Sequence, residues 1–307
     1  MRIVKKLKKI LIGAVAVATL AGVSHLSEGI NILENFNKEA KESVVNQIDN
    51  TSNSEVSGVL TVDYIDVGQG DSALVNVNGK YMLIDAGTNA SEKDLINYLK
   101  GKNIQKIDYV IGTHPHEDHI GGLDKVIDNF DIGQVYLPKI SHTTKTYESV
   151  LESIKNKNLK VITAKEGVKI DLGPGTTVEM YSPNKSKYDN LNDYSSIIKV
   201  SFGEKKFLFT GDAEREAENE VIKKGVDLSA DVLKVGHHGS DTSTSNDFLE
   251  KVNPKIAIIS CGKGNDYGHP HNSTLNKLEG RNIRTFRTDE VGTVQVESDG
   301  KNLTVRE

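Results

Sequence analysis

Residues 113–122, with the sequence THPHEDHIGG, restrict the fold of this chain more than any other segment. The apolar run at residues 107–111 comes directly before them, and a loop at the end of a buried strand can direct alternate side chains into one pocket. Imidazole nitrogens and carboxylate oxygens are the ligands that suit zinc and similar divalent ions. The segment therefore predicts a metal site built from three histidines and one aspartate within six residues: His114, His116, Asp118 and His119.

The spacing of these donors favours two ions rather than one. His114 and His116 can hold the first ion, while Asp118 and His119 hold a second nearby. Two such ions can share a water and lower its pKa towards neutrality, which gives a hydroxide nucleophile. Asp212 ends a second apolar run behind Gly211, where its carboxylate can bridge both ions. We expect zinc, with manganese as the alternative, and a catalytic role for Asp118.

Strand and helix patterns alternate along the chain from about residue 58. Residues 59–67, 72–77 and 81–84 predict an antiparallel meander, with Asn78-Gly79 as one of its turns. Strands then alternate with helices, and a second β-rich run at residues 167–210 is followed by the same alternation. Two halves of this kind predict an α+β fold with two mixed sheets face to face and helices outside. Asp85 ends a buried strand and is expected to hold the metal loop by hydrogen bonds.

The N-terminal region has a different composition. Five bases and no acids lie in residues 1–21, so the rest of the chain is more acidic than the formal charge of -5 indicates, which disfavours a protein that coats nucleic acid. Residues 1–24 predict a signal peptide or an N-terminal anchor, residues 25–57 a polar linker, and residues 58–307 the hydrolase domain. We expect export, with the protein secreted or attached to the outer face of the cytoplasmic membrane through this segment alone. No protein partner is inferred.

The metal-binding segment matches the signature of the metallo-β-lactamase superfamily, and the chain resembles this family over about residues 59–305. The resemblance implies a four-layer αββα sandwich with the site at one edge of the paired sheets. It also implies that His237 is the last metal-ligand histidine. The adjacent His238 is expected to point elsewhere, towards substrate or a hydrogen-bond partner. The single Cys261 excludes both an intrachain disulfide and a cysteine-rich zinc site.

Three further stretches resemble the hydrolase domain of ComEC-type DNA-uptake proteins and their free-standing relatives: DVGQGDS at 66–72, HHGS at 237–240 and NDYGHPH at 265–271. The resemblance implies a phosphodiester substrate, with DNA as one candidate, and we expect the large membrane-channel part of those proteins to be absent. By analogy with phosphoesterases of this fold, His269 contacts the scissile phosphate or protonates the leaving group. Ser240 and His271 are further candidates for contact with substrate or ligands.

One departure from the superfamily pattern concerns the first ion. Many members have a histidine before the Gly-Asp strand, where this chain has Asn192, Asp193 and Ser195 instead. One of these three is expected to supply a weaker oxygen contact, so the first ion binds loosely or is one that tolerates oxygen ligands, such as manganese.

These patterns predict an exported metal-dependent hydrolase, a phosphodiesterase or nuclease of ComEC-like type that uses a metal-bridged hydroxide. One alternative is a cell-surface esterase, a lactonase, or a phosphodiesterase acting on lipid or wall material. Another is a weakly catalytic, metal-containing binding module, which predicts a degraded second metal site.

Overall fold

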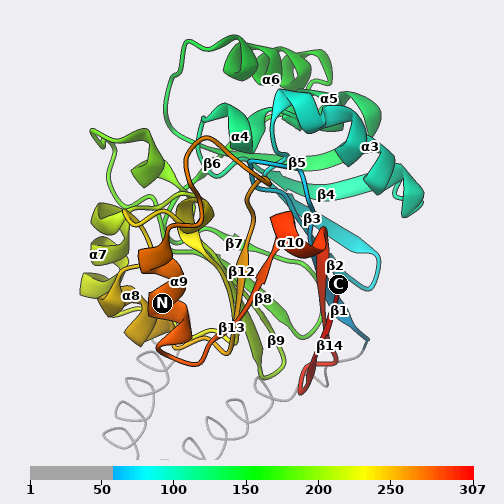
Figure 1. Ribbon diagram of the computed structural model, residues 1–307. Coiled ribbons are helices and arrows are strands. Elements are labelled where there is room, and N and C mark those ends of the chain that lie inside the picture. Colours follow the sequence, from blue (N-terminus) through cyan, green and yellow to red (C-terminus); the bar gives the residue numbers. More distant parts are fainter. Residues whose placement is uncertain (1–57) are drawn as a thin grey trace, which may run out of the picture. The chain divides into compact units, whose positions relative to one another are not determined.

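Two mixed β-sheets lie face to face at the centre of the molecule, and helices cover the outer face of each (Figure 1). The computed structural model describes residues 58–307. The predictions for residues 1–24 and 25–57 lie outside the described residues. Within the described range, no helix is long and apolar enough to cross a membrane. The predicted αββα sandwich is confirmed.

The first sheet has eight strands in the order β15-β14-β1-β2-β3-β4-β5-β6. Its early strands form the predicted antiparallel meander, and both Asn78 and Gly79 have positive φ (52° and 84°), as a two-residue type I′ hairpin turn requires. From β3 to β6 the pairing is parallel. The strands are β1 Leu60–Tyr64, β2 Ala73–Val77, β3 Lys80–Ile84, β4 Lys106–Ile111, β5 Asp131–Pro138, β6 Val161–Ala164, β14 Val294–Ser298 and β15 Leu303–Arg306.

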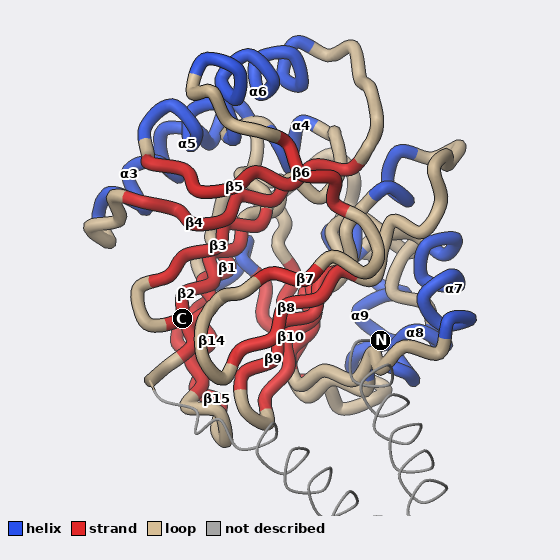
Figure 2. The backbone as a smooth tube through the Cα atoms, turned by 180° about the vertical axis from the view of Figure 1, so that it is seen from behind, coloured by secondary structure: helices blue, strands red, loops and turns tan. Residues whose placement is uncertain are grey.

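The second sheet has seven strands in the order β13-β12-β11-β10-β9-β8-β7. Its strands from β10 to β13 pair in parallel, and those from β7 to β10 pair in antiparallel fashion. Strands β7 to β10 of this sheet are labelled in Figure 2. The strands are β7 Lys169–Ile170, β8 Thr176–Met180, β9 Ile198–Phe202, β10 Lys205–Phe209, β11 Val232–Lys234, β12 Ile256–Ile259 and β13 Arg284–Arg287.

Helices α3 to α6 accompany the first sheet and helices α7 to α9 the second (Figure 1). The α-helices are α3 Glu92–Gly101, α4 Glu117–Ile120, α5 Leu123–Asn129, α6 Lys145–Asn156, α7 Arg215–Lys224, α8 Asn246–Val252, α9 Asn272–Glu279 and α10 Thr288–Val291. Three short 3-10 turns complete the described elements: η1 Asn89–Ser91, η2 Leu191–Tyr194 and η3 Gly236–Gly239.

Side-chain alternation along the strands creates three apolar layers. In β2, Val75 and Val77 pack between the sheets, whereas Leu74 faces the helices of the first half. In β10, Phe207 points into the central layer and Leu208 points to the helices of the second half. A strand with apolar residues on both faces must be covered on both sides, so this pattern produces four layers rather than two.

Strand ends position the polar residues. Asp85 follows β3 and residues 113–119 follow β4, while Asp212 follows β10 and residues 236–239 follow β11. Because β3 pairs in parallel with β4, and β10 with β11, the carboxyl ends of each pair lie at one edge of their sheet. The two edges meet, and the donors predicted from the sequence gather there.

Candidate metal centre

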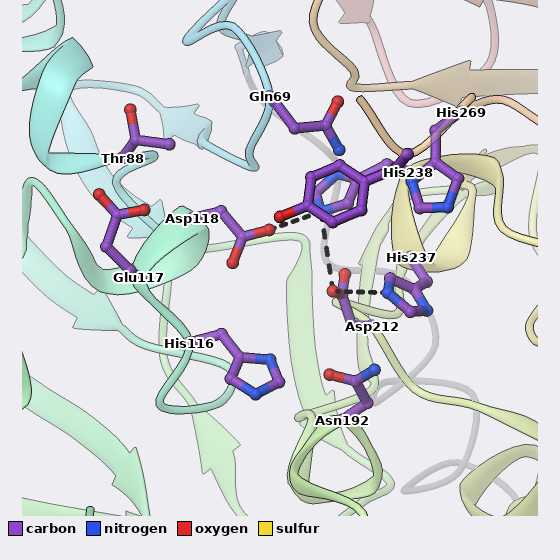
Figure 3. Close-up of a pocket in the computed structure, with 11 residues that line it drawn as sticks. Gln69, Thr88, His116, Glu117, Asp118, Asn192, Asp212, His237, His238 and His269 are labelled. Carbon is purple, nitrogen blue, oxygen red and sulfur yellow. Dashed lines mark hydrogen bonds and ion pairs between the residues drawn. The ribbon is translucent and has the colours of Figure 1, made fainter. Parts of the chain in front are cut away.

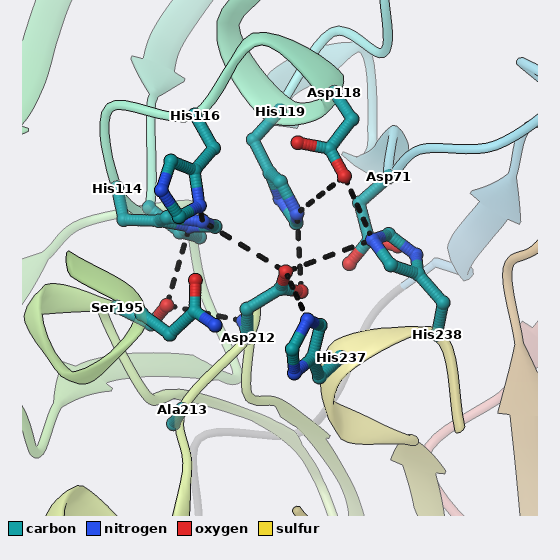
Figure 4. A network of polar contacts seen from close by, with 12 residues as sticks. Asp71, His114, His116, Asp118, His119, Ser195, Asp212, Ala213, His237 and His238 are labelled. Carbon is teal, nitrogen blue, oxygen red and sulfur yellow. Dashed lines mark hydrogen bonds and ion pairs between the residues drawn. The ribbon is translucent and has the colours of Figure 1, made fainter. Parts of the chain in front are cut away.

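Two groups of donor atoms meet at this edge and share the carboxylate of Asp212, which lies at the centre of Figure 4. Within each group the ligand atoms all lie within 4.8 Å of one another. The first group is His114, His116 and Asp212, and the second is Asp118, His119, Asp212 and His238. The arrangement fits two ions bridged by one carboxylate.

The second group is almost fully buried, and some of its ligand atoms have no hydrogen-bond partner. His119 Nε2 lies 3.0 Å from Asp212 Oδ1, yet both atoms are buried and neither has a hydrogen-bond partner. His238 Nε2 lies 3.1 Å from Asp118 Oδ2 and 3.6 Å from Asp212 Oδ2. Buried polar atoms are normally satisfied, so orphaned donors that face a common point fit a divalent ion placed there.

Hydrogen bonds behind the second group fix which imidazole nitrogen faces the site. His119 Nδ1 lies 2.8 Å from Asp85 Oδ2, and the same carboxylate accepts hydrogen bonds from the backbone N–H and the hydroxyl of Thr113. His238 Nδ1 lies 2.9 Å from the Ser260 carbonyl oxygen. With each Nδ1 engaged from behind, Nε2 is the nitrogen that faces the site and can bind a metal once it has lost its proton.

A buried ion pair also lies behind His238. The Lys234 ammonium is 2.7 Å from Asp71 Oδ2, and Asp71 Oδ1 is 3.3 Å from His238 Nδ1. Removal of one partner from a buried pair leaves an uncompensated charge, which costs about 3–5 kcal/mol. Replacement of Lys234 or Asp71 is therefore costly to the fold. The ion pair keeps the Asp71 carboxylate next to His238.

The expectation that His238 points away from the metal donors is wrong. His237 and His238 have consecutive positive φ values of 49° and 52°, a left-handed conformation that is uncommon for residues other than glycine. His237 Nε2 lies 3.7 Å from Asp212 Oδ2, and its Nδ1 lies 3.3 Å from Glu214 Oε1. His238, and not His237, lies among the donors of the second group. The role of His237 as a ligand therefore stays a prediction.

The carboxylates around the site control the charges of its histidines. Burial opposes a charge on His119, but Asp212, Asp85 and Asp118 together raise its pKa well above the ordinary value. Burial likewise opposes a charge on His238, yet the neighbouring carboxylates, Asp212 first, raise its pKa to about 10. The carboxylates thus favour positive charge at the second group. Protons on the histidines supply this charge in the absence of metal, and divalent ions supply it when bound.

The first group has fewer donors and weaker support. His114 Nε2 lies 3.0 Å from His116 Nδ1 and 3.8 Å from Asp212 Oδ2. Behind it, His114 Nδ1 contacts the hydroxyls of Ser195 and Thr113, each at 3.2 Å. Burial lowers the pKa of both His114 and His116, so both imidazoles are neutral and can offer a lone pair.

The three residues expected to complete the first ion differ in what they can offer. Ser195 Oγ accepts a hydrogen bond from the Asp212 N–H and contacts His114, so it supports the donors from behind. Asp193 Oδ1 accepts from the backbone N–H groups of Glu214 and Ala217 and caps α7. Asn192 lines the pocket, and its Oδ1 is buried without a partner. Of the three side chains, Asn192 is the one that lines the cavity, so its oxygen is the best placed for an ion or a substrate.

The donors open into a cavity of about 480 Å³. Figure 3 shows His116 and Asp118 on one side of it and His237, His238 and Asp212 on the other. The lining residues are Gln69, Thr88, His116, Glu117, Asp118, Asn192, Asp212, His237, His238, Tyr267 and His269.

His269 lines the cavity as the sequence analysis expects, with its Nδ1 buried and unpartnered. Burial, together with the charges of His238 and His237, lowers its pKa to about 4. The neutral ring suits hydrogen bonding to a phosphoryl oxygen better than proton donation, and its role stays a prediction.

Ser240 and His271 are not among the residues that line this cavity, and their expected role, contact with substrate or support of the residues around the ligands, stays a prediction. The Ser240 hydroxyl lies 3.0 Å from the hydroxyl of Thr242, and His271 Nδ1 accepts from the backbone N–H of Asp241. Both residues hold loops next to the site.

Several residues that surround the donors are not predicted from the sequence. Lys234 interrupts an otherwise apolar strand, which is a signal for a buried, paired charge. Glu214 follows Asp212 by two residues, and Gln69 lies in a glycine-rich turn, but neither position has a pattern that separates it from an ordinary loop. Only the folding of separate segments onto the same sheet edge places these residues beside the donors.

Two groups of histidine and aspartate donors at the edge of an αββα sandwich define a metal-binding protein of the metallo-β-lactamase fold. The sequence pattern of the metallo-beta-lactamase superfamily matches residues 65–263. The chain belongs to this superfamily.

Several known proteins are similar to this chain. ComE operon protein 3 of Bacillus subtilis is 34% identical over 252 residues, which cover 76% of this chain and 32% of that protein. Recombination protein 2 of Haemophilus influenzae is 31% identical, over 76% of this chain and 28% of that protein. Competence protein ComA of Neisseria gonorrhoeae is 30% identical, over 75% of this chain and 31% of that protein. The chain thus spans about a third of the length of these curated relatives, and the resemblance to competence proteins is confirmed.

A solved structure shares the fold at lower identity. The metallo-beta-lactamase fold protein YhfI from Bacillus subtilis superposes with a TM-score of 0.54 at 13% identity, over 79% of this chain and all of that one. This likeness supports the architecture alone.

Proposed function

We propose that the chain is an exported metal-dependent phosphodiesterase that acts as a nuclease. One observation carries the proposal: two groups of metal donors share Asp212, and an open cavity lies next to them. A binding module with little activity predicts a degraded second site, whereas Asp118, His119, Asp212 and His238 are all present and converge.

The residues fit two divalent ions, with zinc as the expected metal and manganese as the alternative at the first group. When bound, such ions supply a water of lowered pKa and neutralise charge on phosphoryl oxygens. Asp85 and Asp71 orient His119 and His238 from behind.

Asp118 and His269 are the two side chains of the cavity that we assign to contact with the reactants. Asp118 lines the cavity with a side chain that is 30% exposed; its Oδ2 is engaged by His238, and its other carboxylate oxygen can accept a hydrogen bond from the attacking water. The pKa of Asp118 lies below its ordinary range, because burial is outweighed by the charge of His119 and the hydrogen bond from His238. The carboxylate is therefore suited to orienting the water. His269 can contact the phosphate from the opposite wall.

Relatives named for competence and recombination support a nucleic acid as the substrate. Export rests on the apolar and basic composition of residues 1–24.

Metal analysis of the purified protein, followed by turnover assays with and without chelator, tests the proposal. Bis(p-nitrophenyl) phosphate, DNA and a lactone serve as the three substrates. We expect two ions per chain and chelator-sensitive cleavage of both phosphodiesters that is lost in His116→Ala. Cleavage of the lactone alone, or no bound ion after incubation with zinc or manganese, contradicts the proposal. Activity confined to the small phosphodiester contradicts its nuclease part.

A further inference from the structure

One aromatic side chain at the cavity is largely exposed to solvent. Tyr267 is 68% exposed, whereas the other exposed large hydrophobic side chains among the described residues range from 37% to 43%. It is also the one member of this exposed set that lines the cavity with the metal donors. An exposed aromatic ring beside a polar site is a common means of ligand contact.

The loop that carries Tyr267 is held in place by hydrogen bonds. Asn265 Oδ1 accepts from the backbone N–H groups of Tyr267 and His269, at 3.1 and 3.0 Å. Asn265 Nδ2 donates to the carbonyl oxygens of Gly262 and His269. His271 Nε2 lies 3.3 Å from the Tyr267 carbonyl oxygen. The backbone around Tyr267 is therefore fixed on both sides while the ring remains exposed.

Three rings form a row from the metal donors to solvent. The rings of His238 and His269 lie 6.1 Å apart with planes inclined by 29°. Those of His269 and Tyr267 lie 5.6 Å apart with planes inclined by only 18°. A flat group that continued this row would stack on Tyr267 while a phosphate attached to it reached the donors.

The composition of the cavity wall discriminates between classes of phosphodiester. Apart from the methyl group of Thr88, the lining consists of carboxylate, amide, imidazole and phenol side chains. A lipid would require an apolar groove for its acyl chains, and none of these side chains is aliphatic. A nucleobase requires one aromatic face and nearby hydrogen-bonding groups.

We propose that Tyr267 stacks on a base of single-stranded nucleic acid whose phosphate lies at the donors around Asp212. This inference rests on the proposed phosphodiesterase function and specifies its substrate class. In a duplex both faces of an internal base are covered by its neighbours, so only an unpaired or terminal base can offer a face to the ring.

The inference is tested by comparing how the full chain binds two matched single-stranded oligonucleotides. The first strand is a single-stranded oligonucleotide of about 12 nucleotides, and the second has the same backbone with abasic sites throughout. Affinities are measured in a His116→Ala background, so that turnover does not consume the strand. Tyr267→Ala removes the ring, and Tyr267→Phe keeps the ring but removes its hydroxyl.

We expect Tyr267→Ala to weaken binding of the base-containing strand about tenfold, a typical contribution of stacking on one aromatic ring. The abasic strand should bind equally to both proteins, and Tyr267→Phe should bind as the parent does. Equal losses for the two strands, or equal losses in Tyr267→Phe and Tyr267→Ala, overturn the inference.

A fluorescent variant gives a second measurement that a purely structural role would not affect. The sequence contains no tryptophan, so in Tyr267→Trp all tryptophan emission comes from this position. We expect the base-containing strand to quench that emission and the abasic strand to leave it unchanged. Emission that responds equally to both strands contradicts stacking.

These binding measurements require no turnover, so the two proposals fail separately. Base-dependent binding without metal-dependent hydrolysis removes the phosphodiesterase function and keeps the contact. Metal-dependent hydrolysis of both phosphodiesters without base-dependent binding keeps the phosphodiesterase function and removes the contact between Tyr267 and a base.

Discussion

The two donor groups share Asp212 but differ in what supports them. In the second group, carboxylates lie next to the histidines: Asp85 is 2.8 Å from His119 Nδ1, and Asp71 is 3.3 Å from His238 Nδ1, which contacts the Ser260 carbonyl oxygen at 2.9 Å. In the first group, His114 is backed by hydroxyls alone, those of Ser195 and Thr113. A carboxylate raises the basicity of an imidazole ligand more than a hydroxyl does, so the second ion should bind more tightly.

Replacement of the shared ligand should have the largest effect. Asp212→Ala removes the bridge between the groups, and we expect phosphodiester turnover to fall roughly 1000-fold or more, with loss of bound metal. Steady-state kinetics and metal analysis measure the two effects. Asp171→Ala, which alters an exposed aspartate directly after β7 of the second sheet, is the matched control. Two ions retained in Asp212→Ala would show that the groups do not depend on this carboxylate.

Removal of one ligand from each group should separate the two sites. His238→Ala should weaken the tighter site by about 100-fold or more, whereas His116→Ala should leave one tightly bound ion. Titration with zinc against a competing chelator measures both affinities. If His116→Ala also loses the tight ion, the two sites are not independent.

His237→Ala extends the same measurement to the residue that the sequence analysis assigns as a ligand. We expect the tight ion to remain in this variant, because His238 supplies the nitrogen of the second group. Loss of the tight ion would restore His237 as its ligand.

The supporting residues should have smaller and unequal effects. Asp85→Asn should weaken the tight site about 10- to 100-fold, since an amide cannot hold the His119 proton as a carboxylate does. Ser195→Ala should weaken the first site less than about tenfold, because it removes one neutral hydrogen bond. The same zinc titration measures both variants. Equal losses of zinc affinity would contradict the inference that Asp85 supports its site more strongly than Ser195 does.

The pH dependence of metal binding should also separate the sites. In the ion-free protein the raised pKa values of His119 and His238 mean that both carry protons at neutral pH, and these must leave when an ion binds. Affinity at the second site should therefore rise with pH, about tenfold per pH unit for each released proton. The lowered pKa values of His114 and His116 predict little change at the first site between about pH 6 and 8. Calorimetry in buffers of different ionisation enthalpy counts the protons, and equal counts for both ions would contradict this difference.

Local patterns within the sequence determine the fold and the core of the site. Strand alternation and the Asn78-Gly79 turn predict the paired sheets, because side-chain periodicity and turn chemistry act between neighbours in the chain. The segment at residues 113–119 predicts its own donors for the same reason, since the ligands lie within a few residues of one another.

Only the tertiary structure decides what depends on side-chain direction and on contacts between distant segments. His237 and His238 are adjacent and chemically identical, and the left-handed backbone at both residues determines which ring enters the second group. Lys234 and Asp71 are far apart in the sequence and meet only because the two sheets join at one edge. Sequence spacing specifies which donors exist, but the packing of the sheets selects among equivalent donors and supplies the charges behind them.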